Sequence, residues 1–318
     1  MFIRRALAVT VAVAAPLALG GCGDADGTAA PAGDGRLEVL ASVYPLEYVV
    51  SQVGGEHVTV TTLTPAGTDP HSVELSPRQL RDVGAAGLVV HLAGFQPAVD
   101  DAVAERAGDR ALDVAPAADL RPVPDGDAGE HADEAESGEH EDEEDDHGGL
   151  DPHFWLDPTR LGPVGGAIAE ALAEIDPANG DDYAANAQEF AAAMADLDAE
   201  LATGLADCES DVVVTSHAAF GYLADRYGLR QVSVSGIDPE GEPSPARIRE
   251  VREAIADLGV RAVFTEPLAD PAVAATLAED LEVEVLELDP LDGSDPDADY
   301  RQVMAENLEA LRTGLGCR

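Results

Sequence analysis

DVVVTSHAAFGYLADRY, at residues 211–227, places a short apolar run immediately before a histidine and a helical stretch. A run of β-branched residues of this length is typical of a strand that is buried on both faces, as strands in parallel sheets are. Similar runs alternate with helical stretches on both sides of these residues. The sequence therefore predicts an α/β fold built from βαβ units with parallel sheets.

The expected elements form two groups that are separated by a long helical region. In the first half, we expect strands at 37–43, 57–63 and 87–92 and helices at 45–53 and 76–85. In the second half, we expect strands at 211–215, 231–234, 261–265 and 282–288 and helices at 218–227, 245–258, 271–280 and 299–313. Between the groups lie helical stretches at 159–175 and 181–206, the second of which is about seven turns long.

This pattern predicts two lobes, each with a mainly parallel sheet flanked by helices. We expect an N-terminal α/β lobe at 37–178, one long rigid linking helix at 179–206 and a C-terminal α/β lobe at 207–318. A chain of 318 residues is long enough for both lobes to have ordinary domain size and a large core.

The N-terminus has the features of an export signal. Two arginines precede an apolar run at 6–19, which is short for a membrane-spanning helix. LGGC, at 19–22, fits the lipobox of bacterial lipoprotein leaders, in which the cysteine carries the lipid; the alternative is a chance cysteine after an ordinary cleavable leader. We therefore expect a signal peptide at 1–21, lipidation of Cys22 and a flexible tether at 22–36, which would anchor the protein to the outer face of the cytoplasmic membrane.

The charge of the chain narrows the possible ligands. Asp and Glu number 63 against 18 basic residues, so the formal net charge is -45. A surface of this kind repels nucleic acids and anionic lipid and attracts cations. The composition therefore disfavours a nucleic-acid partner and favours a cationic ligand.

An acidic segment at 125–149 interrupts the alternation of strands and helices. It holds almost no apolar residues, and His131, His140 and His147 are spaced through its run of carboxylates. Such a segment cannot bury enough apolar surface to fold alone, so we expect a disordered loop. It either solvates this part of the surface or collects cations for a structured site nearby, since mixed nitrogen and oxygen ligands suit Zn²⁺.

Two further cysteines, Cys208 and Cys317, lie near the two ends of the second lobe. In an exported chain these thiols meet an oxidising compartment, which favours a disulfide between them. The alternative is metal ligation, but neither cysteine belongs to a CxxC pair and both are distant in sequence from the histidine motifs.

Four loops carry candidate metal ligands. His217 directly follows the strand at 211–215, His71 follows the strand at 57–63, His153 lies between two Asp-Pro pairs, and Asp289 ends the strand at 282–288. In open α/β sheets, ligands bind beyond the carboxyl ends of the strands. Neutral imidazoles in such loops can converge on one metal ion, so the sequence predicts a metal site in the cleft between the lobes.

Two carboxylates, Asp289 and Glu266, have more than one candidate role. Asp289 precedes a proline and could start a turn, in which case water would complete the coordination. Glu266, in the FTEP stretch, is a candidate for orienting an imidazole, because a ligating histidine usually donates its other N–H to an acceptor.

Five motifs together resemble those of the zinc- and manganese-binding lipoproteins that serve as substrate-binding components of ABC metal importers. They are LTPAGTDPHSVELSPRQL, LDPHFWLDP, TSHAAFGYLADRYGL, FTEPLADP and LDPLDG. The resemblance implies two α/β lobes joined by one long helix, with metal bound between them and delivered to a membrane permease. By motif, His71, His153 and His217 match the three metal-binding histidines of the family and Asp289 matches its carboxylate ligand.

The ligand types favour zinc as the metal. Three imidazoles and one carboxylate suit tetrahedral Zn²⁺, whereas Mn²⁺ prefers more oxygen ligands. Manganese-binding members usually carry Glu where this chain has His217, and the acidic segment resembles that of zinc members. We therefore expect a monomeric zinc-binding lipoprotein without enzymatic activity; the alternatives are a manganese-binding member, a zinc hydrolase with Glu266 as general base, or a surface adhesin.

Overall fold

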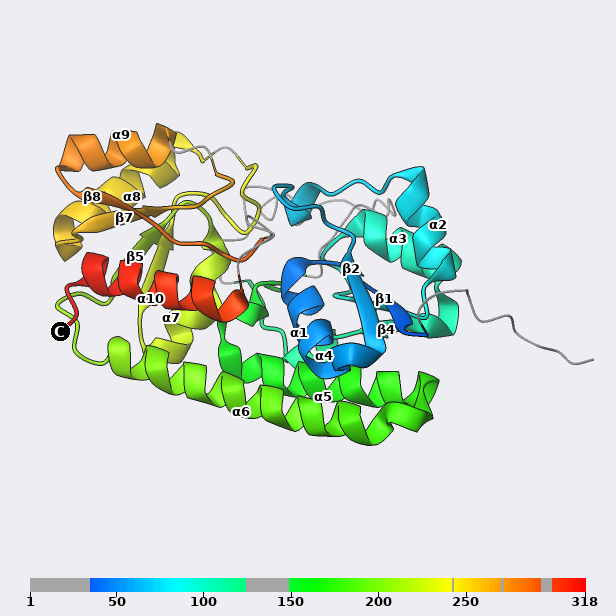
Figure 1. Cartoon of the computed structure of the whole chain (residues 1–318). Helices are drawn as coiled ribbons and strands as arrows, with labels where there is room; N and C mark the ends of the chain where they lie inside the picture. The colour runs from blue at the N-terminus through cyan, green and yellow to red at the C-terminus, as the bar shows by residue number, and fades with distance from the viewer. Residues whose placement is uncertain (1–34, 124–148, 242, 270–271, 293–298) are drawn as a thin grey trace, which may run out of the picture. The chain divides into compact units, whose positions relative to one another are not determined.

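The computed structural model describes residues 35–123, 149–241, 243–269, 272–292 and 299–318 (Figure 1). The predicted signal peptide at 1–21, the predicted lipidation site Cys22 and the histidines of the acidic segment lie outside these residues. Within the described part of the chain, no helix is both long enough and apolar enough to cross a bilayer.

The first half of the chain forms a parallel sheet with the strand order β2-β1-β3-β4. The strands are β1 (Leu37–Ala41), β2 (Val58–Thr62), β3 (Leu88–His91) and β4 (Ala111–Asp113). Leu40 and Val89 pack under α2 (Pro77–Ala85) and α3 (Pro97–Arg106), while Val39 and Val90 point to the other face, toward α1 (Tyr44–Gly54). β4, α3 and the short α4 (Ala115–Ala118) were not predicted.

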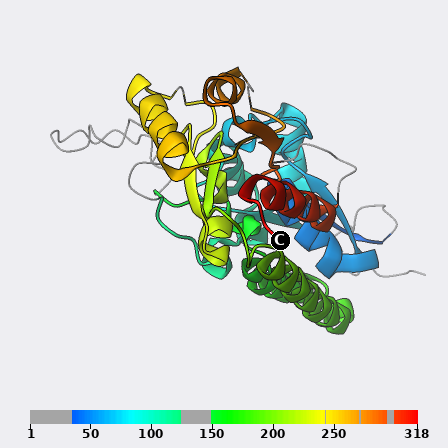
Figure 2. The ribbon, with the colours of Figure 1, turned by 90° about the vertical axis from the view of Figure 1, so that its left-hand side faces the viewer.

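The second half repeats this order, β6-β5-β7-β8. The strands are β5 (Val212–Thr215), β6 (Arg230–Ser233), β7 (Ala262–Thr265) and β8 (Glu284–Glu287). One face is covered by α8 (Pro245–Leu258) and α9 (Ala272–Leu281), and the other by α7 (Gly221–Tyr227) and α10 (Tyr300–Leu315) (Figure 2). Because both faces are buried, Val212, Val213 and Val214 form the uninterrupted apolar run that the sequence shows.

Two long helices, α5 (Pro158–Ile175) and α6 (Gly180–Gly204), lie side by side (Figure 1). They approach closely because α5 carries glycines on the contact face: a methyl group added to Gly165 would lie 2.9 Å from the Phe190 ring. α6 has 25 residues and is therefore about 37 Å long. It connects the half with the first sheet to the half with the second, which confirms the predicted class of two parallel-sheet lobes and one long helix.

The two lobes also share a hydrophobic core. A single cluster of buried side chains includes Val39 of the first sheet, Phe264 of the second and Trp155 between them. The indole N–H of Trp155 donates to the carbonyl of Pro290 at 2.8 Å, and the hydroxyl of Tyr300 donates to the carbonyl of Trp155 at 2.7 Å. These buried contacts oppose a wide separation of the lobes.

The predicted disulfide between Cys208 and Cys317 is confirmed. It joins the segment after α6 to the end of α10. The two cysteines are 109 residues apart in sequence. Next to it, the N–H groups of Glu209 and Ser210 donate to the carbonyl of Leu315. The end of α10 is therefore fastened to the start of the second lobe.

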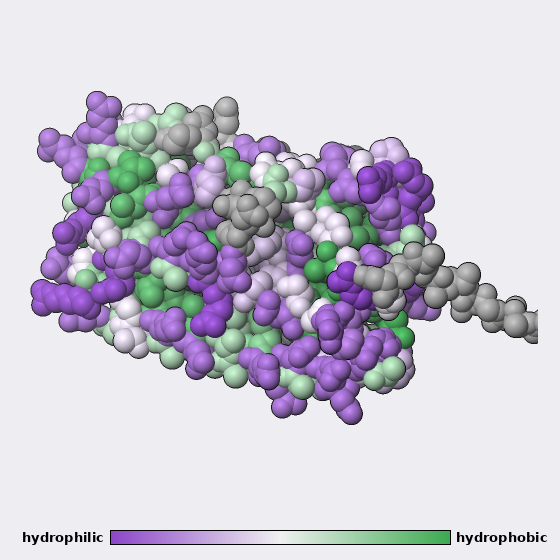
Figure 3. All heavy atoms as spheres, in the orientation of Figure 1, coloured by the Kyte–Doolittle hydropathy of each residue, from purple (hydrophilic) through white to green (hydrophobic). Residues whose placement is uncertain are grey.

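Hydrophilic side chains spread over most of the face shown in Figure 3. Acidic residues outnumber basic ones across the chain, so this surface attracts cations rather than anions.

Candidate metal centre

The candidate ligands lie in loops at the carboxyl ends of parallel strands. His217 follows β5, Glu266 follows β7 and the stretch from Asp289 to Asp292 follows β8. From the first lobe, His71 comes from the short helix after β2. His153 immediately precedes another short helix, Phe154–Leu156. The βα geometry therefore delivers residues from both lobes to one place.

The three histidines meet through their Nε2 atoms. Nε2 of His153 lies 3.3 Å from Nε2 of His71 and 3.4 Å from Nε2 of His217. His153 and His217 are almost fully buried, and His71 is partly buried. Ring nitrogens at these separations match the spacing of imidazole ligands around one tetrahedral divalent cation.

Carboxylates hold the opposite side of two of these rings. Glu266 makes a close ion pair with Nδ1 of His217 through Oε2, and its Oε1 accepts the backbone N–H of the same histidine at 3.0 Å. Oδ1 of Asp151 accepts from Nδ1 of His153 at 2.9 Å and from its backbone N–H at 3.0 Å. Each carboxylate fixes the ring so that the Nε2 lone pair faces the centre.

The fourth residue of the cluster is Asp292. One ligand atom from each of His71, His153, His217 and Asp292 can be chosen so that all four lie within 4.8 Å of one another. Asp292 is only 8% exposed, and its Oδ1 has no hydrogen-bond partner. A buried carboxylate oxygen without a donor is costly unless something positively charged approaches it.

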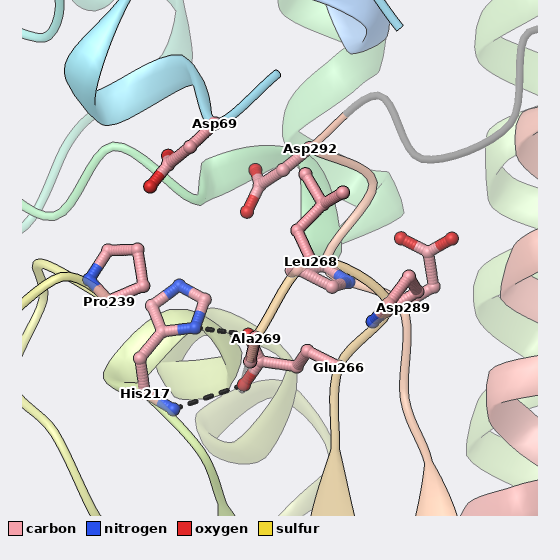
Figure 4. Close-up of a pocket in the computed structure, with 10 residues that line it drawn as sticks. Asp69, His217, Pro239, Glu266, Leu268, Ala269, Asp289 and Asp292 are labelled. Carbon is pink, nitrogen blue, oxygen red and sulfur yellow. Dashed lines mark hydrogen bonds and ion pairs between the residues drawn. The ribbon is translucent and has the colours of Figure 1, made fainter. Parts of the chain in front are cut away.

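Asp289, the carboxylate predicted from the sequence, does not belong to this cluster. Its Oδ1 accepts the N–H of Leu291 at 2.7 Å, and its backbone N–H and carbonyl are held by Asn307 of α10. Figure 4 shows its carboxylate turned away from His217, whereas that of Asp292 points toward the open space beside the ring. The geometry therefore brings Asp292, and not the predicted Asp289, together with the three histidines.

The physical reason for this difference is a turn that recurs in this chain. In each Asp-Pro-X sequence at the site, the aspartate side chain accepts the N–H of the residue two positions on, as in Asp69 to His71 at 2.9 Å and Asp151 to His153 at 3.0 Å. Asp289 makes the same turn with Leu291. The carboxylate of an Asp-Pro turn thus shapes its own loop and is less available to a metal.

Burial and charge set the protonation of the cluster. Burial and then the nearby His217 hold the pKa of His153 well below its usual value. Burial acts in the same direction on His217, but the carboxylates of Glu266, Asp292 and Asp69 together outweigh it, so the pKa of His217 is raised. Burial raises the pKa of Asp292 well above its usual value, and it raises that of Asp151 to about 7. Metal binding must therefore displace protons, since it needs neutral imidazoles and an ionised carboxylate.

A hollow of about 360 Å³ adjoins the cluster on the side of Asp292 and His217 (Figure 4). Its walls include Asp69 of the first lobe and Leu268 and Pro239 of the second. Asp69 lies across this hollow from His217. The centre is thus reached through a recess that both lobes line and that carries negative charge.

The remaining histidines in the described residues stand apart from the cluster. His57 pairs with Asp182 at 3.1 Å, and His91 pairs with Asp100 at 3.2 Å. His131, His140 and His147 lie outside the described residues. Sequence reasoning missed Asp151, although its place two residues before His153 in an Asp-Pro turn was a usable signal.

Comparison with known proteins places these features in a wider group. The sequence profile of the family described as zinc-uptake complex component A, periplasmic (ZnuA), matches residues 39–314. The zinc-binding protein AdcA of Streptococcus pyogenes is 30% identical over 288 residues, which cover 88% of this chain and 56% of AdcA. The chain therefore spans about half the length of the AdcA proteins that it matches.

Other relatives match over nearly their whole length. The high-affinity zinc uptake system protein ZnuA of Bacillus subtilis is 30% identical over 306 residues, which cover 94% of each chain. The crystal structure of a zinc-bound variant of AdcAII from Streptococcus pneumoniae superposes with a TM-score of 0.75 at 28% identity, covering 89% of this chain and all of that one.

Proposed function

The chain belongs to the ZnuA family of periplasmic zinc-uptake components, and we propose on that premise that it captures Zn²⁺ outside the cytoplasmic membrane and delivers it to the permease of an ABC importer. The observation that carries the proposal is the convergence of His71, His153, His217 and Asp292. Two of these ligands come from each lobe, so the metal would bridge the lobes as cargo that is later released.

The donor set supports zinc over manganese. Three imidazole nitrogens and one carboxylate match the tetrahedral coordination that Zn²⁺ adopts, while Mn²⁺ prefers six ligands that are mostly oxygen. Asp151 and Glu266, which hold the rings of His153 and His217, contact the Nδ1 atoms on the far side from the centre. They are therefore poorly placed to add oxygen ligands.

The site supports binding rather than catalysis. A zinc hydrolase needs a carboxylate free to act as general base beside the metal-bound water. Glu266, the candidate for that role, has both oxygens engaged by His217, one with the ring and one with the backbone N–H. We therefore assign it to the orientation of His217 and propose no enzymatic activity.

The proposal includes the way the protein is held and supplied with metal. A lipid on Cys22 would keep a monomeric protein close to its permease, with the tether at 22–36 giving it reach. The acidic segment at 125–149, with His131, His140 and His147, would raise the local concentration of cations beside the site.

Competition titration tests this function directly. Metal-free protein is titrated with Zn²⁺ in the presence of a chelator of known affinity, and the same is done with Mn²⁺. We expect one site that binds Zn²⁺ tightly and with higher affinity than Mn²⁺. This site should be lost in His153→Ala. His57→Ala is the matched control, because His57 also pairs with a carboxylate but lies away from the centre. Tighter binding of Mn²⁺, or an undiminished zinc site in His153→Ala, would refute the assignment.

A further inference from the structure

Tyr222, in α7 of the second lobe, reaches into the first lobe. Its hydroxyl accepts the backbone N–H of Arg121 at 2.8 Å and donates to the backbone carbonyl of Asp151 at 2.9 Å. Tyr222 is 1% exposed, and its hydrogen bond to the carbonyl of Asp151 is buried. One hydroxyl of the second lobe therefore joins two separate backbone positions of the first.

The ring of Tyr222 is also held by cations from the first lobe. The guanidinium carbon of Arg121 lies 3.9 Å from the ring centroid, and that of Arg160 lies 4.6 Å from it. Both distances are within the range of favourable cation–π contacts. Arg121 also forms an ion pair with Asp225, three residues after Tyr222 in α7. Contacts of three kinds thus fasten α7 to the first lobe at this point.

The residue that Tyr222 holds is the one that orients a metal ligand. The N–H of Asp151 donates to the carbonyl of Arg121 at 2.8 Å, and Tyr222 binds the carbonyl of Asp151. The carboxylate of Asp151 receives both the ring Nδ1 and the backbone N–H of His153, and Nη2 of Arg121 lies 4.0 Å from its other oxygen. A chain of short contacts therefore runs from α7 of the second lobe to a ligand contributed by the first.

We propose that Tyr222 and Arg121 are positioning residues that hold His153 in its metal-binding orientation, through Asp151, only while the two lobes are in contact. This inference rests on the proposed function. When the lobes separate at α7, His153 loses the contacts that orient it. The same movement takes His217 and Asp292 away from His153. The contact thereby sets the rate at which the metal leaves the site.

Tyr222→Phe tests the proposal because it removes the hydroxyl and keeps the ring between the two arginines. The zinc-loaded protein is mixed with excess chelator in a stopped-flow instrument, and the dissociation rate of zinc is recorded. We expect an increase of about tenfold, the lower end of what losing an outer partner of a metal ligand costs in affinity. Tyr227→Phe is the matched control, since Tyr227 is also in α7 but its hydroxyl binds Asp198 of α6; its rate should equal that of the wild type.

Two more measurements separate positioning from a general loss of structure. The Co²⁺-loaded Tyr222→Phe protein should show an altered visible spectrum, which reports ligand geometry, while the melting temperature of its metal-free form stays close to that of Tyr227→Phe. Asp225→Asn changes a residue whose side chain is 72% exposed, so it leaves the fold intact; we expect zinc to leave about two to five times faster.

An unchanged zinc dissociation rate in Tyr222→Phe overturns the proposal, and if that variant does not fold, an unchanged rate in Asp225→Asn does so. A wild-type protein that binds no zinc tightly would instead refute the proposed function, so the two failures are distinguishable.

Discussion

Replacement of Asp292 by asparagine should weaken zinc binding and stabilise the metal-free protein at the same time. Asp292→Asn removes the one anionic ligand of the cluster and offers a neutral amide oxygen in its place. Zinc affinity should fall by more than the 10- to 100-fold, or about 1.4–2.7 kcal/mol, that the loss of an outer partner of a ligand typically costs.

The gain in stability follows from the cost of burying this carboxylate. Asp292 is 8% exposed and its Oδ1 has no donor, so its ionised form costs more than an unsatisfied neutral group, which costs about 1–3 kcal/mol, and a neutral asparagine avoids the buried charge. Burial, and then the negative charges of Glu266 and Asp69, raise its pKa well above the usual value of about 4. From about pH 4 up to the raised pKa, this carboxyl binds fewer protons in the unfolded chain than in the folded one, so the contribution of Asp292 to stability falls as the pH rises.

Thermal unfolding with and without zinc, at several pH values, measures both effects. The melting temperature of metal-free Asp292→Asn should exceed that of the wild type by about 2–4 °C for each kcal/mol gained in the free energy of unfolding. This difference should grow as the pH rises from about 4. Asp289→Asn is the matched control, because an asparagine oxygen can still accept the N–H of Leu291. Wild-type zinc affinity in Asp292→Asn, together with weakened binding in Asp289→Asn, would show that the assignment of the fourth ligand is wrong.

Three further predictions concern the surroundings of the site. Glu266→Gln should weaken zinc binding about 10- to 100-fold in competition titrations, whereas Asp182→Asn, which alters an exposed carboxylate beside another histidine, should not change it. The double change Cys208→Ser and Cys317→Ser should lower the free energy of unfolding by up to about 5 kcal/mol, measured with denaturant, because the disulfide closes a loop across 109 residues; zinc affinity should stay the same. Deletion of 125–149 should slow zinc capture at low metal concentration and leave the equilibrium affinity of the folded site unchanged; complete loss of binding would contradict this role.

The periodicity of the sequence was sufficient to predict most of the fold. Buried strands such as Val212–Thr215 are short apolar runs, and helices such as Pro245–Leu258 begin at a serine cap followed by proline. The strand at Ala111–Asp113 escaped prediction because three residues give no measurable period. The helix at Pro97–Arg106 carries two adjacent aspartates among its alanines and valines, which weakens its apolar stripe.

The histidines of the site could be predicted, but its carboxylates could not be told apart. LDPLDG contains two aspartates three residues apart, and motif reasoning selected the first. The choice depends on where each side chain points after the turn: Asp289 closes its own Asp-Pro turn and is held at α10 by Asn307, whereas Asp292 is carried into the centre. Of the carboxylates that contact the Nδ1 atoms, Glu266 was a candidate from the sequence, whereas Asp151 was missed although its place in the Asp-Pro turn before His153 was a usable signal.

In the proposed function, the division of ligands between the lobes would reconcile tight capture of zinc with its release from a structure whose shared core opposes wide opening. His71 and His153 from one lobe, or His217 and Asp292 from the other, supply only two donors each, which is half of a tetrahedral zinc sphere. Zn²⁺ tolerates deviations of only about 0.2 Å in its bond lengths, so a relative shift of roughly an ångström is enough to abolish four-coordinate binding. Such a shift is compatible with a core in which Trp155 stays packed between the lobes, because it requires side-chain adjustment rather than exposure of the core.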